Sequence, residues 1–149
     1  MQDGKLKPYL KSQPIPEFNN ETVKVVVAET LEDMVFNSGK DVLLEFYRLG
    51  CRYCEEFAPV LDEIAISFEK DPHVVIAKID GTENDIPRDV FEVEGFPTLY
   101  LRSSTGSLSR FEGNKTKEAI IEFIQTNRSS PAFDFSISQT QTDQVKDEL

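Results

Sequence analysis

The feature that most constrains this fold is an almost wholly apolar segment followed at once by a long amphipathic one. Residues 42–47 are apolar except for Glu45, as expected of a central strand buried on both faces. Within residues 51–70 the apolar side chains recur at the three- and four-residue period of one helix face, at Phe57, Val60, Leu61, Ile64, Ala65 and Phe68. A buried strand that leads into such a helix is typical of a sheet covered by helices.

The rest of the chain alternates strand-like and helix-like segments. Runs of β-branched and other apolar residues predict strands at residues 23–28, 74–79, 98–102 and 108–111. Helices are predicted from Thr30 onward, around residues 88–91 and over residues 116–126. This order predicts an α/β fold with a mixed central sheet and helices on both faces.

The two ends differ from the middle in composition. Residues 1–21 contain Pro8, Pro14 and Pro16 among polar residues, which predicts a linker from a preceding domain. Residues 129–149 are rich in Ser, Thr, Gln and Asp, so we expect a disordered tail. One folded domain is therefore expected over residues 22–128.

The charge balance argues against two classes of partner. The net charge is −11 and Lys and Arg do not cluster, which argues against nucleic acid and against an anionic membrane surface. No apolar run approaches the roughly 18 residues that a membrane-spanning helix needs. We therefore expect a soluble chain without membrane insertion.

The two cysteines are candidates for the chemistry. Cys51 and Cys54 are the only cysteines, and they lie where the central strand meets the long helix. The positive end of the helix dipole favours a thiolate at Cys51, which makes it the expected nucleophile. Cys54 follows on the same helix face and could attack a mixed disulfide at Cys51, as a resolving thiol does.

Two other interpretations of the cysteine pair stay open. An inert structural disulfide is one, although closing so small a loop gives little chain-entropy stabilisation. Half of a zinc site is the other, but zinc normally takes four ligands and His73 is the only histidine. We therefore favour redox chemistry and expect no metal.

Several motifs around the cysteines resemble those of a known family. The matching segments are Leu44-Glu45-Phe46-Tyr47, Ala58-Pro59, Lys78-Ile79-Asp80 and Gly95-Phe96-Pro97-Thr98. They resemble a protein disulfide isomerase catalytic domain over residues 22–128, and in detail the last thioredoxin domain of plant-type disulfide isomerases. The resemblance implies a thioredoxin fold and a thiol–disulfide oxidoreductase or isomerase acting on unfolded or misoxidised clients. It implies no bound cofactor, only redox exchange with glutathione or an oxidase partner.

The resemblance also implies roles for individual residues. Pro97 matches a cis-proline that faces the cysteines and binds extended client peptide, together with Gly95, Phe96 and Tyr53. Glu45 matches a buried acid that relays a proton to or from Cys54, and burial would raise its pKa toward that role. A turn proline at Pro97 and a solvent-facing Glu45 are the alternatives. Lys115 stands where the family has an arginine near the buried cysteine.

This chain departs from the family pattern beside the cysteines. Gly50 replaces an aromatic residue, Arg52-Tyr53 replaces the usual Gly-His, and Glu55 replaces a lysine. Arg52 favours the Cys51 thiolate whereas Glu55 opposes it, so we expect a less oxidising pair than is typical of the family. A client-binding module with weakened redox chemistry is the alternative function.

The end of the chain points to a cellular location. Lys146, Asp147, Glu148 and Leu149 match a signal that a receptor reads to retain proteins in the endoplasmic reticulum lumen. The first residues lack a secretory signal peptide, so we expect a C-terminal fragment of a longer precursor, monomeric as a fragment. Candidate glycosylation sites follow from the sequons at Asn20, Asn114 and Asn127.

Overall fold

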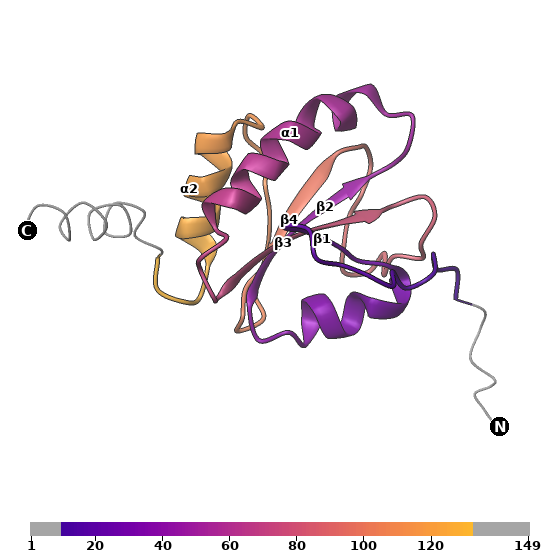
Figure 1. Cartoon of the computed structure of the whole chain (residues 1–149), viewed down its shortest axis with the longest axis horizontal. Coiled ribbons are helices and arrows are strands. Elements are labelled where there is room, and N and C mark those ends of the chain that lie inside the picture. The colour runs from indigo at the N-terminus through magenta and orange to yellow at the C-terminus, as the bar shows by residue number, and fades with distance from the viewer. Residues whose placement is uncertain (1–9, 133–149) are drawn as a thin grey trace, which may run out of the picture.

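The computed structural model describes residues 10–132 and contains one five-stranded sheet with helices on both faces (Figure 1). The strands are β1 (Val23–Val25), β2 (Asp41–Tyr47), β3 (Val74–Asp80), β4 (Thr98–Arg102) and β5 (Leu108–Arg110). The two long helices are α1 (Arg52–Ser67) and α2 (Lys117–Asn127). Two short helical turns, η1 (Ala28–Thr30) and η2 (Glu32–Phe36), follow β1.

The sheet is mixed, with strand order β1-β3-β2-β4-β5. β3 pairs in parallel with both β1 and β2, whereas β4 pairs antiparallel with β2 and β5. β2 therefore lies at the centre with a parallel neighbour on one side and an antiparallel neighbour on the other. This confirms the predicted α/β architecture.

The side chains of β2 alternate between two hydrophobic cores. Leu43 packs with α1 and α2, whereas Val42, Leu44 and Phe46 pack on the opposite face of the sheet with η2 and with side chains of β3 and β4. Because successive strand residues point to opposite faces, Glu45 lies on the same face as Leu43 and points toward α1. Burial on both faces explains why the segment is so apolar.

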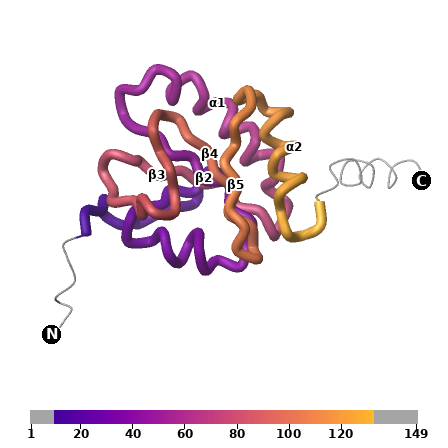
Figure 2. Tube along the Cα trace, turned by 180° about the vertical axis from the view of Figure 1, so that it is seen from behind, coloured from indigo at the N-terminus to yellow at the C-terminus, as the bar shows by residue number. Residues whose placement is uncertain are grey.

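Helix α2 closes the domain on the α1 side. Figure 2 shows it beside β5 when the molecule is viewed from behind, and the rings of Phe111 and Phe123 lie 5.2 Å apart there. The buried stripe predicted for α1 is confirmed, since Phe57, Leu61 and Ile64 all lie in the core that α1 and α2 share. α1 continues through Pro59.

The short elements differ from their predictions. The strand predicted over residues 23–28 ends at Val25, and the helix predicted to begin at Thr30 is split into η1 and η2. The Thr30 hydroxyl accepts from the Val27 amide at 3.0 Å and so closes η1 instead of capping a following helix. Residues 88–91 form a turn and no helix, with the Phe91 amide bonded to the Pro87 carbonyl at 3.0 Å.

Residues at both ends of the described chain pack against the domain. The Lys11 carbonyl accepts from the Asp85 amide at 2.8 Å, and the Gln13 amide donates to Asn84 at 2.9 Å. At the other end the amides of Ser129 and Ser130 donate to the buried carboxylate of Asp41. Residues on both sides of the predicted domain, 22–128, therefore contact the sheet or its loops. The assignment of residues 1–21 as an interdomain linker stays a prediction.

Candidate active site

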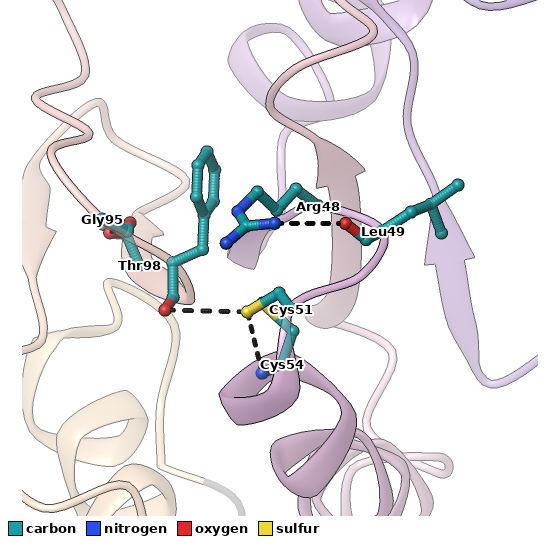
Figure 3. The surroundings of a disulfide bond; sticks show 7 residues. Arg48, Leu49, Cys51, Cys54, Gly95 and Thr98 are labelled. Carbon is teal, nitrogen blue, oxygen red and sulfur yellow. Dashed lines mark hydrogen bonds between the residues drawn. A yellow bond between two sulfur atoms is a disulfide. The ribbon is translucent and has the colours of Figure 1, made fainter.

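Cys51 and Cys54 form a disulfide at the start of α1 (Figure 3), with Cα atoms 5.2 Å apart. Gly50 has a φ of +73°, a left-handed conformation that glycine adopts without the steric cost of a Cβ atom. This turn places Cys51 at the N-cap position of α1, where its Sγ accepts from the Cys54 amide at 3.1 Å. The sulfur therefore lies where the helix dipole favours negative charge.

The loop that leads into β4 faces this disulfide, because the start of β4 pairs with the end of β2. The Phe96–Pro97 peptide bond is cis, and the Phe96 carbonyl oxygen lies 3.9 Å from Cys51 Sγ. The Gly95 carbonyl accepts from the Thr98 hydroxyl at 2.6 Å, which ties the loop to the start of β4. The structure thus places the loop of Gly95, Phe96 and Pro97 beside Cys51, and a client-binding role for this loop stays a prediction.

A groove of about 460 Å³ runs beside the disulfide. Tyr53, which is 70% exposed, lies on one side of it, and Phe96, Pro97, Asn114 and Lys115 also line it. The groove mixes aromatic surface with backbone polar groups at the Pro97 loop.

A second cavity, of about 170 Å³, lies behind the disulfide and contains Glu45 and Cys54 in its lining. Glu45 is 3% exposed, which rules out the solvent-facing alternative. Burial raises the pKa of Glu45 to about 7, against the opposing effect of the Lys78 ammonium and with a smaller contribution from Asp62. The cavity is large enough for several water molecules, so a proton could pass between the two side chains.

The charged residues near the cysteines do not all lie where the sequence suggested. The Arg52 Nε donates to Glu56 Oε2 at 3.2 Å, and both side chains are exposed. Glu55 is exposed and lines the cavity of Glu45 and Cys54. Lys115 lines the groove at Tyr53 and Pro97, and is absent from the lining of the Glu45 cavity.

Sequence reasoning missed three residues around the site. Tyr47 and Arg48 line the Glu45 cavity, and the Lys78 ammonium lies 5.5 Å from the centre of the Tyr47 ring. Lys78 belongs to a motif that the sequence analysis quoted, and that motif was the signal available; the parallel register of β2 and β3 places Lys78 opposite Glu45. The sequence carried no comparable signal for Arg48.

The remaining predicted sites are the candidate glycosylation sites and the retention signal, and among them Asn114 also lines the groove beside the disulfide. Asn20 and Asn114 are exposed, whereas the Asn127 Nδ2 donates to the Phe123 carbonyl at 2.9 Å and its Oδ1 accepts from Ser109 at 3.4 Å. The predicted retention signal, residues 146–149, lies outside the described residues. Between residues 10 and 132 there is no cluster of three or more metal-ligating side chains, and no helix of that region is long and apolar enough to span a membrane.

Comparison with known proteins places this geometry in a family. The thioredoxin family model matches residues 22–126. The chain belongs to the thioredoxin family. Within it, the chain is 54% identical to a protein disulfide-isomerase of Medicago sativa and 55% identical to one of Datisca glomerata, each over 99% of this chain. It spans only 30% and 29% of the lengths of those two relatives.

A solved structure supports the same assignment and confirms the predicted thioredoxin fold. The first thioredoxin domain of mouse protein disulfide-isomerase A4 matches with a TM-score of 0.62 and 31% identity. That match covers 79% of this chain and 85% of the mouse domain. The resemblance inferred from the motifs is therefore confirmed at the level of the domain.

Proposed function

We propose that this chain is a thiol–disulfide oxidoreductase and isomerase domain that acts on cysteines of folding client proteins. The observation that carries the proposal is the Cys51–Cys54 disulfide at the N-terminus of α1, with Cys51 Sγ beside the Phe96–Pro97 loop. Relatives named protein disulfide-isomerase support it. No bound cofactor is needed, because the cysteine pair itself carries the two electrons.

Oxidation of a client takes two steps, and each step forms one disulfide bond and breaks another. A client thiolate attacks Cys51 Sγ, which forms a mixed disulfide and releases Cys54 as a thiolate. A second client thiolate attacks the client sulfur of the mixed disulfide, which forms the client disulfide and releases the Cys51 thiolate. The client loses two electrons and the domain gains them, so glutathione disulfide or an oxidase partner must then reoxidise the pair.

Glu45 would exchange a proton with Cys54 during these steps. A pKa of about 7 lets its carboxyl group protonate the departing Cys54 thiolate and, in the reverse direction, accept a proton from the Cys54 thiol. The cavity that both side chains line supports transfer through water. Lys115 faces the client groove instead, so its contribution there would be to client binding.

The alternative of a client-binding module without redox chemistry is less well supported. The groove at Tyr53 and Pro97 fits both functions, but binding alone does not require a second cysteine or a buried acid beside it. The disulfide and the named relatives favour exchange chemistry.

The proposal extends to location and modification. Residues 146–149 would bind a retention receptor and keep the parent protein in the endoplasmic reticulum lumen. In that compartment Asn20 and Asn114 could accept glycans because they are exposed. Asn127 is a poorer acceptor, since its amide nitrogen is already hydrogen bonded.

Refolding of scrambled ribonuclease tests the function directly. The wild-type chain should restore ribonuclease activity in a glutathione buffer, and Cys51→Ser should abolish the effect. Cys54→Ser should trap a mixed disulfide between Cys51 and the client, because the resolving thiol is gone. The binding module would be the correct function under a different outcome. In that case the wild-type chain and Cys51→Ser would suppress aggregation of a reduced client equally well, and neither of them would exchange disulfides.

A further inference from the structure

An arginine that the proposed chemistry has not used, Arg48, lines the cavity that also contains Cys54. The Arg48 Cζ lies 6.0 Å from the centre of the Phe96 ring, and the Arg48 Nη1 donates to the Leu49 carbonyl at 3.3 Å. Figure 3 shows the guanidinium between Leu49 and the loop that carries Gly95 and Thr98. Two contacts therefore restrain a side chain that is otherwise exposed.

Phe96 links this guanidinium to Cys51. A Cβ atom at Gly81 would lie 2.7 Å from the Phe96 Cε1, so the ring packs directly on the Gly81 backbone. The carbonyl of the same Phe96 lies 3.9 Å from Cys51 Sγ. One residue, held by the core, thus contacts both the cation and the reactive sulfur.

The other charged groups around the cysteines do not replace this cation. Arg52, on α1, is paired with Glu56. Lys115 lines the groove at Tyr53 and Pro97. Among residues 10–132 Arg48 forms no ion pair, so its charge is not compensated by a partner. The acidic residues that line the two cavities beside the cysteines are Glu45 on β2 and Glu55 and Glu56 on α1.

We propose that Arg48 stabilises the Cys51 thiolate in the reduced protein. Arg48 would thereby supply the positive charge that a histidine between the cysteines provides in the family pattern and that this chain lacks. This inference rests on the proposed function. A fixed cation beside a thiolate lowers the pKa of the thiol, and solvent exposure limits the effect to about one pKa unit or less.

The test is the pH profile of Cys51 alkylation in the reduced 149-residue chain. In Arg48→Gln the Cys51 pKa should rise by about half to one unit, so that iodoacetamide reacts about three- to tenfold more slowly below that pKa. Arg48→Lys should keep part of the effect, because it keeps the charge but loses the planar contact with Phe96. High salt should narrow the difference between wild type and Arg48→Gln.

Arg88→Gln is the matched control, since Arg88 is exposed and lines neither the groove nor the Glu45 cavity. An unchanged profile in Arg48→Gln, or an equal shift in Arg88→Gln, overturns the role of Arg48. The proposed function has a separate readout, exchange of the wild-type chain with glutathione. If wild type exchanges and Arg48→Gln has a normal profile, only the role of Arg48 fails; if wild type does not exchange, the proposed function fails.

Discussion

Glu45 and Glu55 line the same cavity but differ in their contact with water. Glu45 is buried on the α1-facing side of β2, whereas Glu55 is exposed on the first turn of α1. Burial raises the pKa of Glu45 to about 7, while solvent screens the charge of Glu55. The buried Glu45 is therefore the carboxyl for which we propose a proton-transfer role, whereas the proposed effect of Glu55 is a weak negative potential.

Glu45→Gln should change how the stability of the oxidised chain depends on pH. Folding raises the pKa of Glu45 from 4.5 to about 7, so the folded state binds more protons in this window and wild type loses stability as the pH rises through it. The loss between pH 5 and pH 8 should be on the order of 2 kcal/mol. Urea denaturation at several pH values should show this slope in wild type and its absence in Glu45→Gln. Equal slopes in the two chains would contradict the buried, raised-pKa carboxyl.

The same substitution should slow resolution of mixed disulfides near neutral pH. Gln cannot exchange a proton with Cys54, whereas the alkylation rate of Cys51 should change much less. Stopped-flow release of a fluorescent peptide from the mixed disulfide measures the first quantity. Equal release rates in wild type and Glu45→Gln would remove the relay role.

Glu55→Lys should lower the Cys51 pKa by up to about one unit and make the pair more oxidising. The replacement removes a negative charge and adds a positive one at an exposed site, so the stability of the fold should change little. The alkylation pH profile and the glutathione equilibrium measure both effects. Glu69→Lys is a control, because Glu69 is exposed beyond the end of α1, far along the chain from Cys51. Identical behaviour of the two variants would show that net charge alone is responsible.

The longer strands and helices could be predicted from the sequence, because their hydrophobic pattern matches the side chains that the fold buries. β4 has the predicted bounds, and α2 is shifted by one residue from its prediction because Thr116 acts as its N-cap. The predictions for the short segments near residues 30 and 88 were wrong in detail. A few residues carry little periodicity, so tertiary contacts decide the conformation of such segments. η1, for example, depends on the Asn84 side chain, which accepts from the Ala28 amide at 2.9 Å.

Thr116→Ala tests the cap of α2. The Thr116 Oγ1 accepts from the Ala119 amide at 3.2 Å, and removal of such a cap typically costs about 1 kcal/mol. Chemical denaturation should show a loss of that size. Thr116→Ser retains the hydroxyl and should behave nearly as wild type; a loss in Ser equal to that in Ala would contradict the capping role.

At the scale of the whole molecule, buried polar groups connect the residues that follow α2 with the sheet and with the segment before β3. Asp41, at the first position of β2, accepts from the amides of Ser104, Ser129 and Ser130 and from the Ser130 hydroxyl. Arg128 forms a buried ion pair with Asp71 at 2.9 Å. These contacts hold residues 128–130, which follow α2, against the sheet.

Asp41→Asn should destabilise the whole domain. Burial opposes the charge of Asp41, but the hydrogen bonds from Ser129, Ser130 and Ser104 outweigh it and lower the Asp41 pKa below 3.8. Stability from this group is therefore present above about pH 4 and is lost as the pH falls further. Replacement should cost about 2 to 4 kcal/mol at pH 7, because an amide cannot accept all of these hydrogen bonds. A loss below about 0.5 kcal/mol, or one that grows toward low pH, would contradict this account.

A feature of the site could be predicted when the residues that form it lie close together in the sequence. The pairing of Cys51 with Cys54 and the cis bond before Pro97 were predictable because local motifs mark them, and the burial of Glu45 followed from the apolar strand around it. The contact of Arg48 with Phe96 could not be predicted, because it joins two loops that only the sheet brings together. The pairing of Arg52 with Glu56 was equally hidden, since Glu55 and Glu56 are both within reach on a helix surface.

The central claim is that Cys51 and Cys54 form a redox pair in exchange with solution thiols. The most direct test is the equilibrium of the purified chain with glutathione buffers of graded ratio, with the oxidised fraction measured by alkylation and mass spectrometry. We predict one two-electron transition. Its potential should lie above about −300 mV and below the luminal poise, which is about −180 to −210 mV. A pair that stays oxidised below about −300 mV would behave as a structural disulfide and would contradict the account.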